Sequence, residues 1–290
     1  MFTDTDFSGL WIPVVTPFHD GKVDTQAISV LVKRLHADGV KGIVVCGSTG
    51  EAAALERAEQ FVVLATALEA APGLPVLMGI SGYHLPQTLA WVQKLAAYPL
   101  AGLLVPPPPY IRPSQAGLLQ WFGAIADAAP APVVIYDIPY RTGVHLERQT
   151  LLELAHHPRI QAIKDCGGDM AKTLAVIAQG KLQVLAGEDL LLFATVAQGG
   201  AGAIAASAHL VTARFVEIIR LLRTGDLLRA RGLWAPLVPW IEAVFAEPNP
   251  APIKAALAAQ GLIHNELRAP MTVSSAEHAA RMVLLLQQTG

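Results

Sequence analysis

The sequence predicts an α/β fold, a (β/α)8 TIM barrel with a C-terminal helical appendage. From Leu10 onward, a short aliphatic run, a glycine- or proline-marked turn and an amphipathic stretch follow one another repeatedly. The short runs are apolar throughout, as expected for strands of a parallel sheet that is covered on its faces. Eight such units within about 220 residues match the size of a (β/α)8 barrel.

Predicted strands and helices alternate along residues 1–224. The strands are Leu10–Thr16, Gly42–Cys46, Val76–Ile80, Gly102–Val105, Val133–Tyr136, Ile160–Lys164, Gln183–Ala186 and Gly202–Ala205. The helices are Thr25–Asp38, Arg57–Ala71, Leu85–Ala97, Ser114–Ala128, Glu147–His156, Asp169–Gln179, Asp189–Gln198 and Thr212–Thr224. A doubly wound open sheet is the competing fold, but Pro13–Pro17 lacks the Gly-x-Gly-x-x-Gly turn that usually follows its first strand.

Residues 225–290 show no strand character. Gly225–Phe245, Pro252–Gln260 and Ser274–Gln288 are predicted helices. The proline-rich segment Glu247–Pro252 is predicted to be stiff and non-helical, because proline fixes φ and restricts the residue before it. We therefore expect two regions, a barrel of residues 1–224 that carries the catalytic site and a helical region of residues 225–290 packed on it.

Composition excludes several classes of function. Hydrophobic residues make up 53% and charged residues 15%, as in compact globular proteins. The net charge of -2 provides no basic field for nucleic acid or anionic membrane. No apolar run reaches the roughly 18 residues of a membrane span, and Met1–Asp6 lacks the basic region of a signal peptide. With only two cysteines, we expect a cytoplasmic protein with reduced thiols.

Lys164 is the candidate nucleophile. It ends the predicted strand Ile160–Lys164, directly before the turn Asp165–Gly168. Burying an amine without a fixed counter-charge disfavours its ammonium form. A neutral amine can form a Schiff base with a carbonyl compound. The structural alternative is a lysine that flanks a strand and extends to water.

Other polar residues follow the predicted strands, at the end where active sites of barrels lie. The amides and hydroxyls of Gly47–Glu51 are suited to bind a carboxylate or phosphate. The structural alternative is a glycine turn whose hydroxyl residue caps a helix. Tyr136 can carry protons or be a core tyrosine. Arg141 offers a fork for a carboxylate, or pairs with Asp137 or Glu147.

Tyr110 and the pair Glu188–Asp189 are the remaining polar groups that follow predicted strands. Tyr110 follows four prolines, which fix an extended loop. This loop either holds the tyrosine ring in place or forms a packing surface. Glu188 and Asp189 are interpreted as helix N-cap residues. The nine histidines show no His-x-His or His-Glu-x-x-His spacing, so no metal site is predicted.

Three motifs, in combination and at matching spacing, resemble one known family. They are Gly47–Glu51, Tyr136–Pro139 and Ile163–Asp165. The chain resembles the dihydrodipicolinate synthase / N-acetylneuraminate lyase family of class I pyruvate aldolases. The resemblance runs over nearly the whole length, from Pro13–Phe18 to Leu267–Met271.

The resemblance implies four catalytic residues. Lys164 forms the Schiff base with pyruvate, and Tyr136 is the general acid and base. The Ser48 hydroxyl links Tyr136 to Tyr110, which reaches the site of a neighbouring subunit. Family membership therefore implies a homotetramer built as a dimer of dimers.

The resemblance also implies the substrate-binding set. Gly47 and Thr49 hold the pyruvate carboxylate, and Arg141 matches the arginine that binds the carboxylate of aspartate semialdehyde. Gly187 and Ile204 belong to the same set, at the ends of the seventh and eighth predicted strands. The implied partners are small molecules, pyruvate and an aldehyde, with no nucleic acid, no membrane, no cofactor and no metal.

The implied activity is the condensation of pyruvate with L-aspartate-4-semialdehyde to 4-hydroxy-tetrahydrodipicolinate, in lysine and diaminopimelate biosynthesis. Ser48, Ile111, Tyr140 and Asp165 depart from the pattern of the synthases. These departures leave open another pyruvate-dependent aldolase or dehydratase, acting on a 2-keto-3-deoxy sugar acid or a related 2-oxo acid. A ligand-binding barrel that has lost turnover is the rival class.

At the positions that bind lysine in lysine-inhibited synthases, this chain carries Arg57, Gln60, Tyr83, Gln87 and Pro109. None of these side chains supplies the carboxylate that is expected to pair with the lysine amine. We therefore expect little feedback inhibition by lysine.

Overall fold

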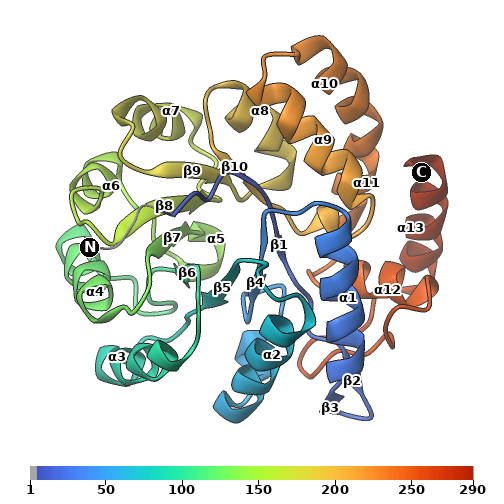
Figure 1. Ribbon diagram of the computed structural model, residues 1–290, viewed down its shortest axis with the longest axis horizontal. Helices are drawn as coiled ribbons and strands as arrows, with labels where there is room; N and C mark the ends of the chain where they lie inside the picture. Colours follow the sequence, from blue (N-terminus) through green and yellow to red (C-terminus); the bar gives the residue numbers. More distant parts are fainter. Residues whose placement is uncertain (1–4, 290) are drawn as a thin grey trace. The chain divides into compact units, whose positions relative to one another are not determined.

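Eight parallel strands form a closed barrel in the order β1-β10-β9-β8-β7-β6-β5-β4. Figure 1 shows the computed structural model, which describes residues 5–289. The strands are β1 (Gly9–Pro13), β4 (Gly42–Val45), β5 (Val76–Gly79), β6 (Gly102–Val105), β7 (Val133–Asp137), β8 (Ile160–Asp165), β9 (Gln183–Ala186) and β10 (Gly202–Ile204). The predicted (β/α)8 barrel is confirmed. The expectations that fall on residues 1–4 and 290 lie outside the described residues.

Helices follow the strands as the sequence predicts. They are α1 (Thr25–Ala37), α2 (Arg57–Ala70), α3 (Leu85–Lys94), α4 (Gln115–Ala128), α6 (Arg148–Leu154), α7 (Met170–Gln179), α8 (Leu192–Ala197) and α9 (Thr212–Arg223). The sequence pattern shows no sign of two short elements, the hairpin of β2 (Phe18–His19) and β3 (Lys22–Val23) and the helix α5 (Pro139–Thr142).

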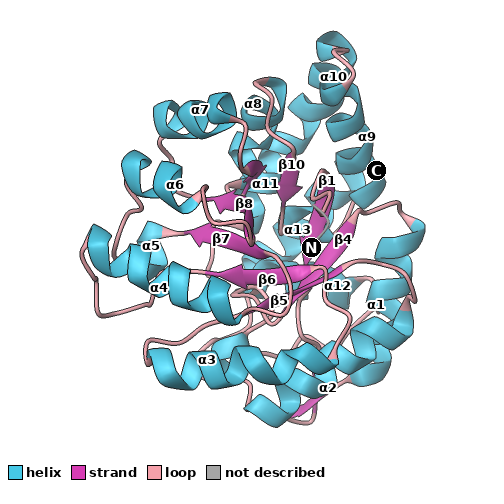
Figure 2. Cartoon of the chain, turned by 60° about the vertical axis from the view of Figure 1, so that its left-hand side comes forward, coloured by secondary structure: helices cyan, strands magenta, loops and turns pink. Residues whose placement is uncertain are grey.

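The described residues pack as two compact units. One contains residues 5–8 and 77–204, and the other residues 9–76 and 205–289. In the first, β6, β7 and β8 are neighbours, and α6 packs against α4 and α7 (Figure 2). In the second, α1 packs against α2. The predicted division at residue 224 cuts the chain elsewhere and stays a prediction.

Strands β4 and β6 each begin at a glycine at which another segment approaches the backbone closely. A Cβ atom on Gly42 would lie 2.3 Å from the ring of Trp11, and one on Gly102 would lie 2.7 Å from the carbonyl oxygen of Pro132. Every residue of β4, β5 and β6 is buried. Such strands read as continuous apolar runs, which is why their positions were predictable.

Helix starts follow from side-chain capping. Asp24, Ser114 and Asp169 each accept a hydrogen bond from the backbone N–H three residues on, at the starts of α1, α4 and α7. Such a bond satisfies one of the N–H groups that the first turn of a helix leaves unpaired.

The C-terminal region differs from the prediction in two places. The predicted helix over residues 225–245 is three elements, α10 (Leu227–Trp234), the 3₁₀ turn η5 (Ala235–Leu237) and α11 (Val238–Val244). Prolines at positions 236 and 239 lack the N–H that a continuous helix needs. Helix α12 (Ala251–Ala259) begins inside the predicted non-helical segment, because proline is tolerated in a first turn. The last helix is α13 (Ala276–Thr289).

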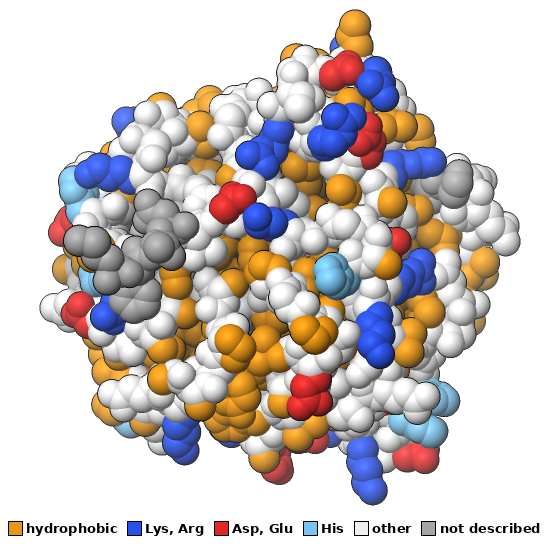
Figure 3. Space-filling view, in the orientation of Figure 1, with side chains coloured by type: hydrophobic (Ala, Val, Ile, Leu, Met, Phe, Trp, Pro, Cys, Tyr) orange, Lys and Arg blue, Asp and Glu red, His pale blue; other side chains and the backbone are white. Residues whose placement is uncertain are grey.

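Charged groups on the surface are mixed in sign. On the face seen in Figure 3, basic and acidic side chains lie among hydrophobic ones without an extended field of either sign. This agrees with the net charge of -2. Within residues 5–289, no helix is long and apolar enough to cross a membrane.

Candidate active site

Lys164 and Tyr136 lie beside each other at the carboxyl ends of β8 and β7. They are Cα partners in the parallel register of the two strands. Their side chains are 6% and 7% exposed. The Nζ atom of Lys164 lies 4.3 Å from the centroid of the Tyr136 ring. The structure therefore brings together the two residues predicted to do the chemistry.

The amine of Lys164 contacts a ring instead of a carboxylate. Across the described part of the chain, it forms no ion pair within 4.0 Å. A buried amine without a fixed carboxylate partner is the arrangement expected of a candidate nucleophile.

The residue after Tyr136 is held by a lysine from α7. Asp137 is 0% exposed and forms an ion pair with Lys172, whose Nζ also donates to the carbonyl oxygen of Leu146 at 3.2 Å. Burial raises the pKa of Asp137, and Lys172 opposes that rise. This pair excludes Asp137 as the salt-bridge partner of Arg141 that the sequence offered.

The residue after Lys164 serves a structural role. The Oδ1 atom of Asp165 accepts from the backbone N–H of Gly167 at 2.8 Å, and Oδ2 accepts from the hydroxyl of Thr173. Asp165 and Asp137 are Cα partners. Both carboxylates thus anchor α7 to the strand ends, directly behind the lysine and tyrosine.

Strand β9 brings Gly187 against Lys164. A Cβ atom at position 187 would lie 2.4 Å from Sγ of Cys166 and 2.8 Å from Cγ of Lys164, so a side chain does not fit there. Ile204, the last residue of β10, is fully buried. Both predicted substrate-binding positions therefore lie at strand ends, and Gly187 lies directly against the lysine.

The predicted capping role does not hold for Glu188. It precedes the 3₁₀ turn η3 (Asp189–Leu191), but its side chain makes no capping hydrogen bond. Glu188 is half-buried, and burial raises its pKa, with Asp189 adding to the rise. Lys164 and the Cys166 thiol oppose the rise. A carboxyl group with a raised pKa that senses the charge of the lysine is a candidate for a further proton carrier. Sequence reasoning missed it because an acidic pair before a helix resembles a cap.

Arg141 and Tyr140 lie on α5, and both side chains are exposed. The guanidinium carbon of Arg141 lies 5.6 Å from the centroid of the Tyr140 ring. Tyr110 is 88% exposed and has a φ of 76°. The single chain therefore leaves the Tyr110 ring in solvent and does not bring it to Tyr136.

Gln115 ties the loop after β6 to the segment after β7. Its Nε2 donates to the carbonyl oxygen of His145 at 2.8 Å. Its Oε1 accepts from the backbone N–H of Glu147 at 3.1 Å and from the hydroxyl of Thr150 at 2.6 Å. These bonds hold the start of α4, which follows the Tyr110 loop, against the segment that follows α5, the helix that carries Tyr140 and Arg141.

In the second unit, the predicted carboxylate-binding loop follows β4. The backbone N–H of Gly50 donates to the carbonyl oxygen of Gly47 at 3.1 Å, and that of Glu51 donates to Ser48 at 3.2 Å. Thr49 is 3% exposed, and its hydroxyl oxygen accepts from Nδ2 of Asn249 at 3.0 Å. Because Asn249 is the donor in that bond, the O–H of Thr49 remains available as a donor.

Glu51, at the end of this loop, pairs with a buried lysine. Its Oε1 atom lies 2.5 Å from Nζ of Lys254, which is 0% exposed and also contacts the Phe18 ring at 4.2 Å. Burial lowers the pKa of Lys254, and Glu51 opposes that change. No sequence pattern indicates which residues Lys254 and Asn249 contact.

A closed parallel barrel with a buried lysine beside a tyrosine at its strand ends has the architecture of a class I aldolase. A family model described as the dihydrodipicolinate synthetase family matches residues 6–289. The chain therefore belongs to this family of enzymes.

Individual relatives agree with the family match. The 4-hydroxy-tetrahydrodipicolinate synthase of Thermosynechococcus vestitus is 36% identical, with 99% of this chain and 98% of the relative covered. That of Thermodesulfovibrio yellowstonii is 33% identical over 98% of this chain and 99% of the relative. The crystal structure of dihydrodipicolinate synthase from Thermotoga maritima matches with a TM-score of 0.95 at 29% identity, covering 98% and 99% of the two chains.

Proposed function

We propose that this protein condenses pyruvate with L-aspartate-4-semialdehyde to form 4-hydroxy-tetrahydrodipicolinate, through a Schiff base on Lys164. The single observation that carries the proposal is the buried lysine amine 4.3 Å from the Tyr136 ring, with no carboxylate paired to it among the described residues. The activity in the names of the relatives supports the choice of substrates.

In the proposed reaction, Nζ of Lys164 attacks the keto carbon of pyruvate. Loss of one water molecule gives the imine, and removal of a methyl proton gives the enamine whose carbon attacks the aldehyde. Tyr136 carries the protons, and Glu188 is a second carrier beside the same lysine. The predicted roles of Gly47 and Thr49 in holding the pyruvate carboxylate, and of Ser48 in relaying protons, are part of this proposal.

Arg141 is the proposed anchor for the carboxylate of the second substrate. Its exposed position leaves the guanidinium fork open to a ligand. The ring of Tyr140, whose centroid lies 5.6 Å from the guanidinium carbon of Arg141, supports an alternative second substrate. A ring at this place narrows the approach to the arginine and suits a different 2-oxo acid, such as a 2-keto-3-deoxy sugar acid.

The proposal includes the assembly and location implied by the family. A Tyr110 ring that is 88% exposed in the single chain is suited to reach a neighbouring subunit, which supports a homotetramer. Two free, buried cysteines support a reducing compartment, the cytoplasm. Sedimentation of the purified protein tests the first point, and cell fractionation tests the second.

Borohydride reduction in the presence of pyruvate tests the Schiff base. The reduced imine is a stable secondary amine, and peptide mapping is expected to find it on Lys164. A chain that forms no adduct is a binding protein or uses another mechanism. Turnover of aspartate semialdehyde with pyruvate, compared with a panel of 2-keto-3-deoxy sugar acids, then tests the second substrate separately.

A further inference from the structure

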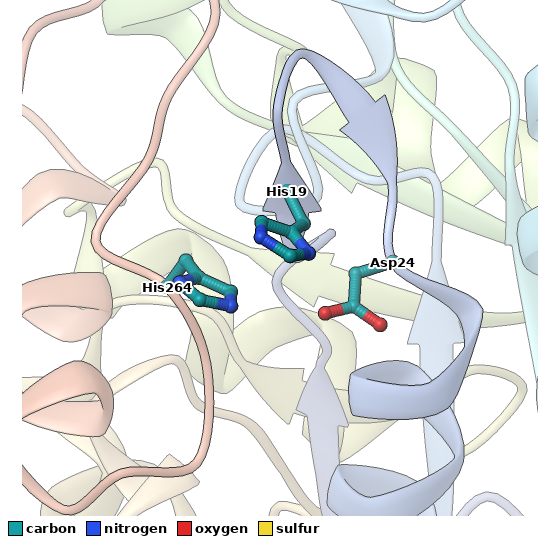
Figure 4. Close-up of side chains that lie close together, drawn as sticks. All are labelled: His19, Asp24 and His264. Atoms are coloured by element: carbon teal, nitrogen blue, oxygen red, sulfur yellow. The ribbon is translucent and has the colours of Figure 1, made fainter.

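Three potential metal ligands from separate segments meet in the second unit. They are His19 on β2, Asp24 at the N-cap of α1 and His264 in the loop after α12. Figure 4 shows the three side chains lying close together. One ligand atom from each lies within 4.8 Å of the other two. We propose that these side chains bind a divalent late first-row transition metal such as Zn²⁺.

The ligand atoms are near one another but wider apart than around a bound ion. Zn²⁺ holds nitrogen and oxygen ligands at about 2.0–2.2 Å in a tetrahedron, so the ligand atoms of one ion lie about 3.4 Å apart. A spread of up to 4.8 Å therefore has to close by about an ångström through side-chain rotation. His19 and His264 are exposed and Asp24 is half-buried, so the imidazoles have room to rotate.

The two imidazoles already contact each other. Their centroids are 4.0 Å apart and the ring planes differ by 9°, as in a stacked pair. Parallel rings direct their in-plane lone pairs along parallel lines, so both cannot point at one ion. Metal binding therefore has to open the stack by tilting one ring, and this change is measurable.

Other contacts hold the segments in place without help from the histidines. The backbone N–H of Gly21 donates to Oε1 of Glu266 at 2.7 Å, and Nη2 of Arg268 donates to the carbonyl oxygen of Gly21 at 2.8 Å. The β2–β3 hairpin and the segment that follows His264 are thus joined near the cluster. The ligands are therefore brought together before any metal binds, which lowers the entropy cost of binding.

The carboxylate of Asp24 is also positioned in advance. Its Oδ1 atom accepts from the backbone N–H of Ala27 at 2.9 Å, which fixes the group and leaves the other oxygen for the ion. Hydrogen bonds of this kind orient metal ligands in known sites. Asp20, with an oxygen 3.8 Å from Nε2 of His19, adds negative charge nearby.

The ligand set determines the class of ion. Two imidazoles and one carboxylate suit Zn²⁺, Ni²⁺, Cu²⁺ or Fe²⁺, whereas Mg²⁺ and Ca²⁺ prefer oxygen ligands. The exposed position allows water to complete the coordination. None of the three residues belongs to the candidate active site, so the inference is independent of the proposed function.

Titration calorimetry of the metal-free, full-length protein with ZnCl2 tests the site. We expect one high-affinity Zn²⁺ per chain, and neither MgCl2 nor CaCl2 should displace it. His264→Ala and His19→Ala should each weaken binding by at least about 10-fold, as expected for loss of a ligand. His36→Ala, an exposed histidine in the last turn of α1, is the matched control and should bind as the unaltered chain does.

Two outcomes would overturn the proposal: unchanged affinity in both His264→Ala and His19→Ala, or an equal loss in His36→Ala. A second readout is X-ray absorption of the zinc-loaded protein, which should show two imidazole nitrogens among the ligands. A spectrum with oxygen ligands only would also refute this site.

Discussion

Two buried lysines, one in each unit, have opposite surroundings. Lys254 is 0% exposed, pairs with Glu51 at 2.5 Å and donates to the carbonyl oxygen of Glu266 at 2.8 Å. Lys164 is 6% exposed and faces the ring of Tyr136, with no ion pair among the described residues. Burial alone therefore does not identify a nucleophile. The partner of the amine distinguishes a structural ammonium group from a reactive one.

Lys172 repeats the structural pattern within the first unit, only eight residues after Lys164. It is 5% exposed and pairs with Asp137. The contrast is therefore not between the two units but between paired and unpaired amines. Replacing the unpaired Lys164 is therefore expected to affect activity, whereas replacing the paired Lys172 or Lys254 is expected to affect stability.

The largest effect is expected for Lys164→Ala. Removing a covalent nucleophile typically lowers kcat by about 10⁴-fold or more, and the borohydride adduct should disappear. The unfolding midpoint should change little, since no ion pair is broken. Steady-state kinetics and urea unfolding measure the two quantities. Lys94→Ala, an exposed lysine on α3, is the control. Near-normal turnover by Lys164→Ala would show that the unpaired amine is not the nucleophile.

Replacing a paired lysine should give the opposite result. Lys172→Met or Lys254→Met leaves a buried carboxylate without its cationic partner, and the free energy of unfolding should fall by about 3–5 kcal/mol. Adding Asp137→Asn or Glu51→Gln in the same chain should recover part of that loss. The midpoints of urea unfolding, compared at an unchanged m-value, measure the loss and its recovery.

The exposed pair Glu217–Arg220 offers a matched control for these variants, because solvent screens it. Arg220→Met should leave the midpoint nearly unchanged. A buried-lysine variant as stable as that control would contradict the structural role of the two ion pairs.

His209 shows how this chain buries a base without a carboxylate partner. It is 3% exposed, and its Nε2 accepts from the backbone N–H of Val15 at 3.1 Å. Burial lowers its pKa from the ordinary 6.5 to about 4. The unfolded state therefore binds the proton more readily. The stability due to the neutral ring is complete above about pH 6.5 and falls as the pH drops toward 4, by about 3 kcal/mol.

Urea unfolding between pH 7 and pH 4 measures this loss. His209→Asn cannot titrate in this range, so its stability should depend less steeply on pH. Equal slopes for the two proteins would contradict a neutral buried His209.

A smaller effect is expected for Arg141→Lys, which keeps the charge but loses the planar fork. If Arg141 binds the second substrate, KM for the aldehyde should rise by about 10-fold. Pyruvate should still label Lys164 on borohydride reduction. Loss of the label would instead connect Arg141 to the first step of the reaction.

The smallest expected effect is that of L-lysine on the rate. The amide of Gln60 donates to the carbonyl oxygens of Ala52 and Leu55 at 3.2 Å, and its Oε1 accepts from Arg57 at 2.9 Å. These bonds occupy both polar ends of the Gln60 side chain, which are therefore not available to a ligand. Steady-state assays should show little inhibition, and half-inhibition at millimolar lysine would contradict this.

Local patterns predicted most of the regular structure. Apolar runs located the barrel strands because strands covered on both faces leave few polar positions. The same reasoning found Lys164, since a lysine at the end of such a run stands out. It failed at residues 225–245, where apolar periodicity hid two proline breaks. It also missed the β2–β3 hairpin, whose strands are two residues each and have no periodicity.

The sequence by itself determined the barrel, the order of its elements and the position of Lys164 at a strand end. Only the tertiary structure decided which buried amines are paired. The partners Glu51 and Lys254, or His19 and His264, lie far apart in the chain and meet through packing. Periodicity and spacing act over a few residues, whereas ion pairs and ligand clusters depend on distances in space.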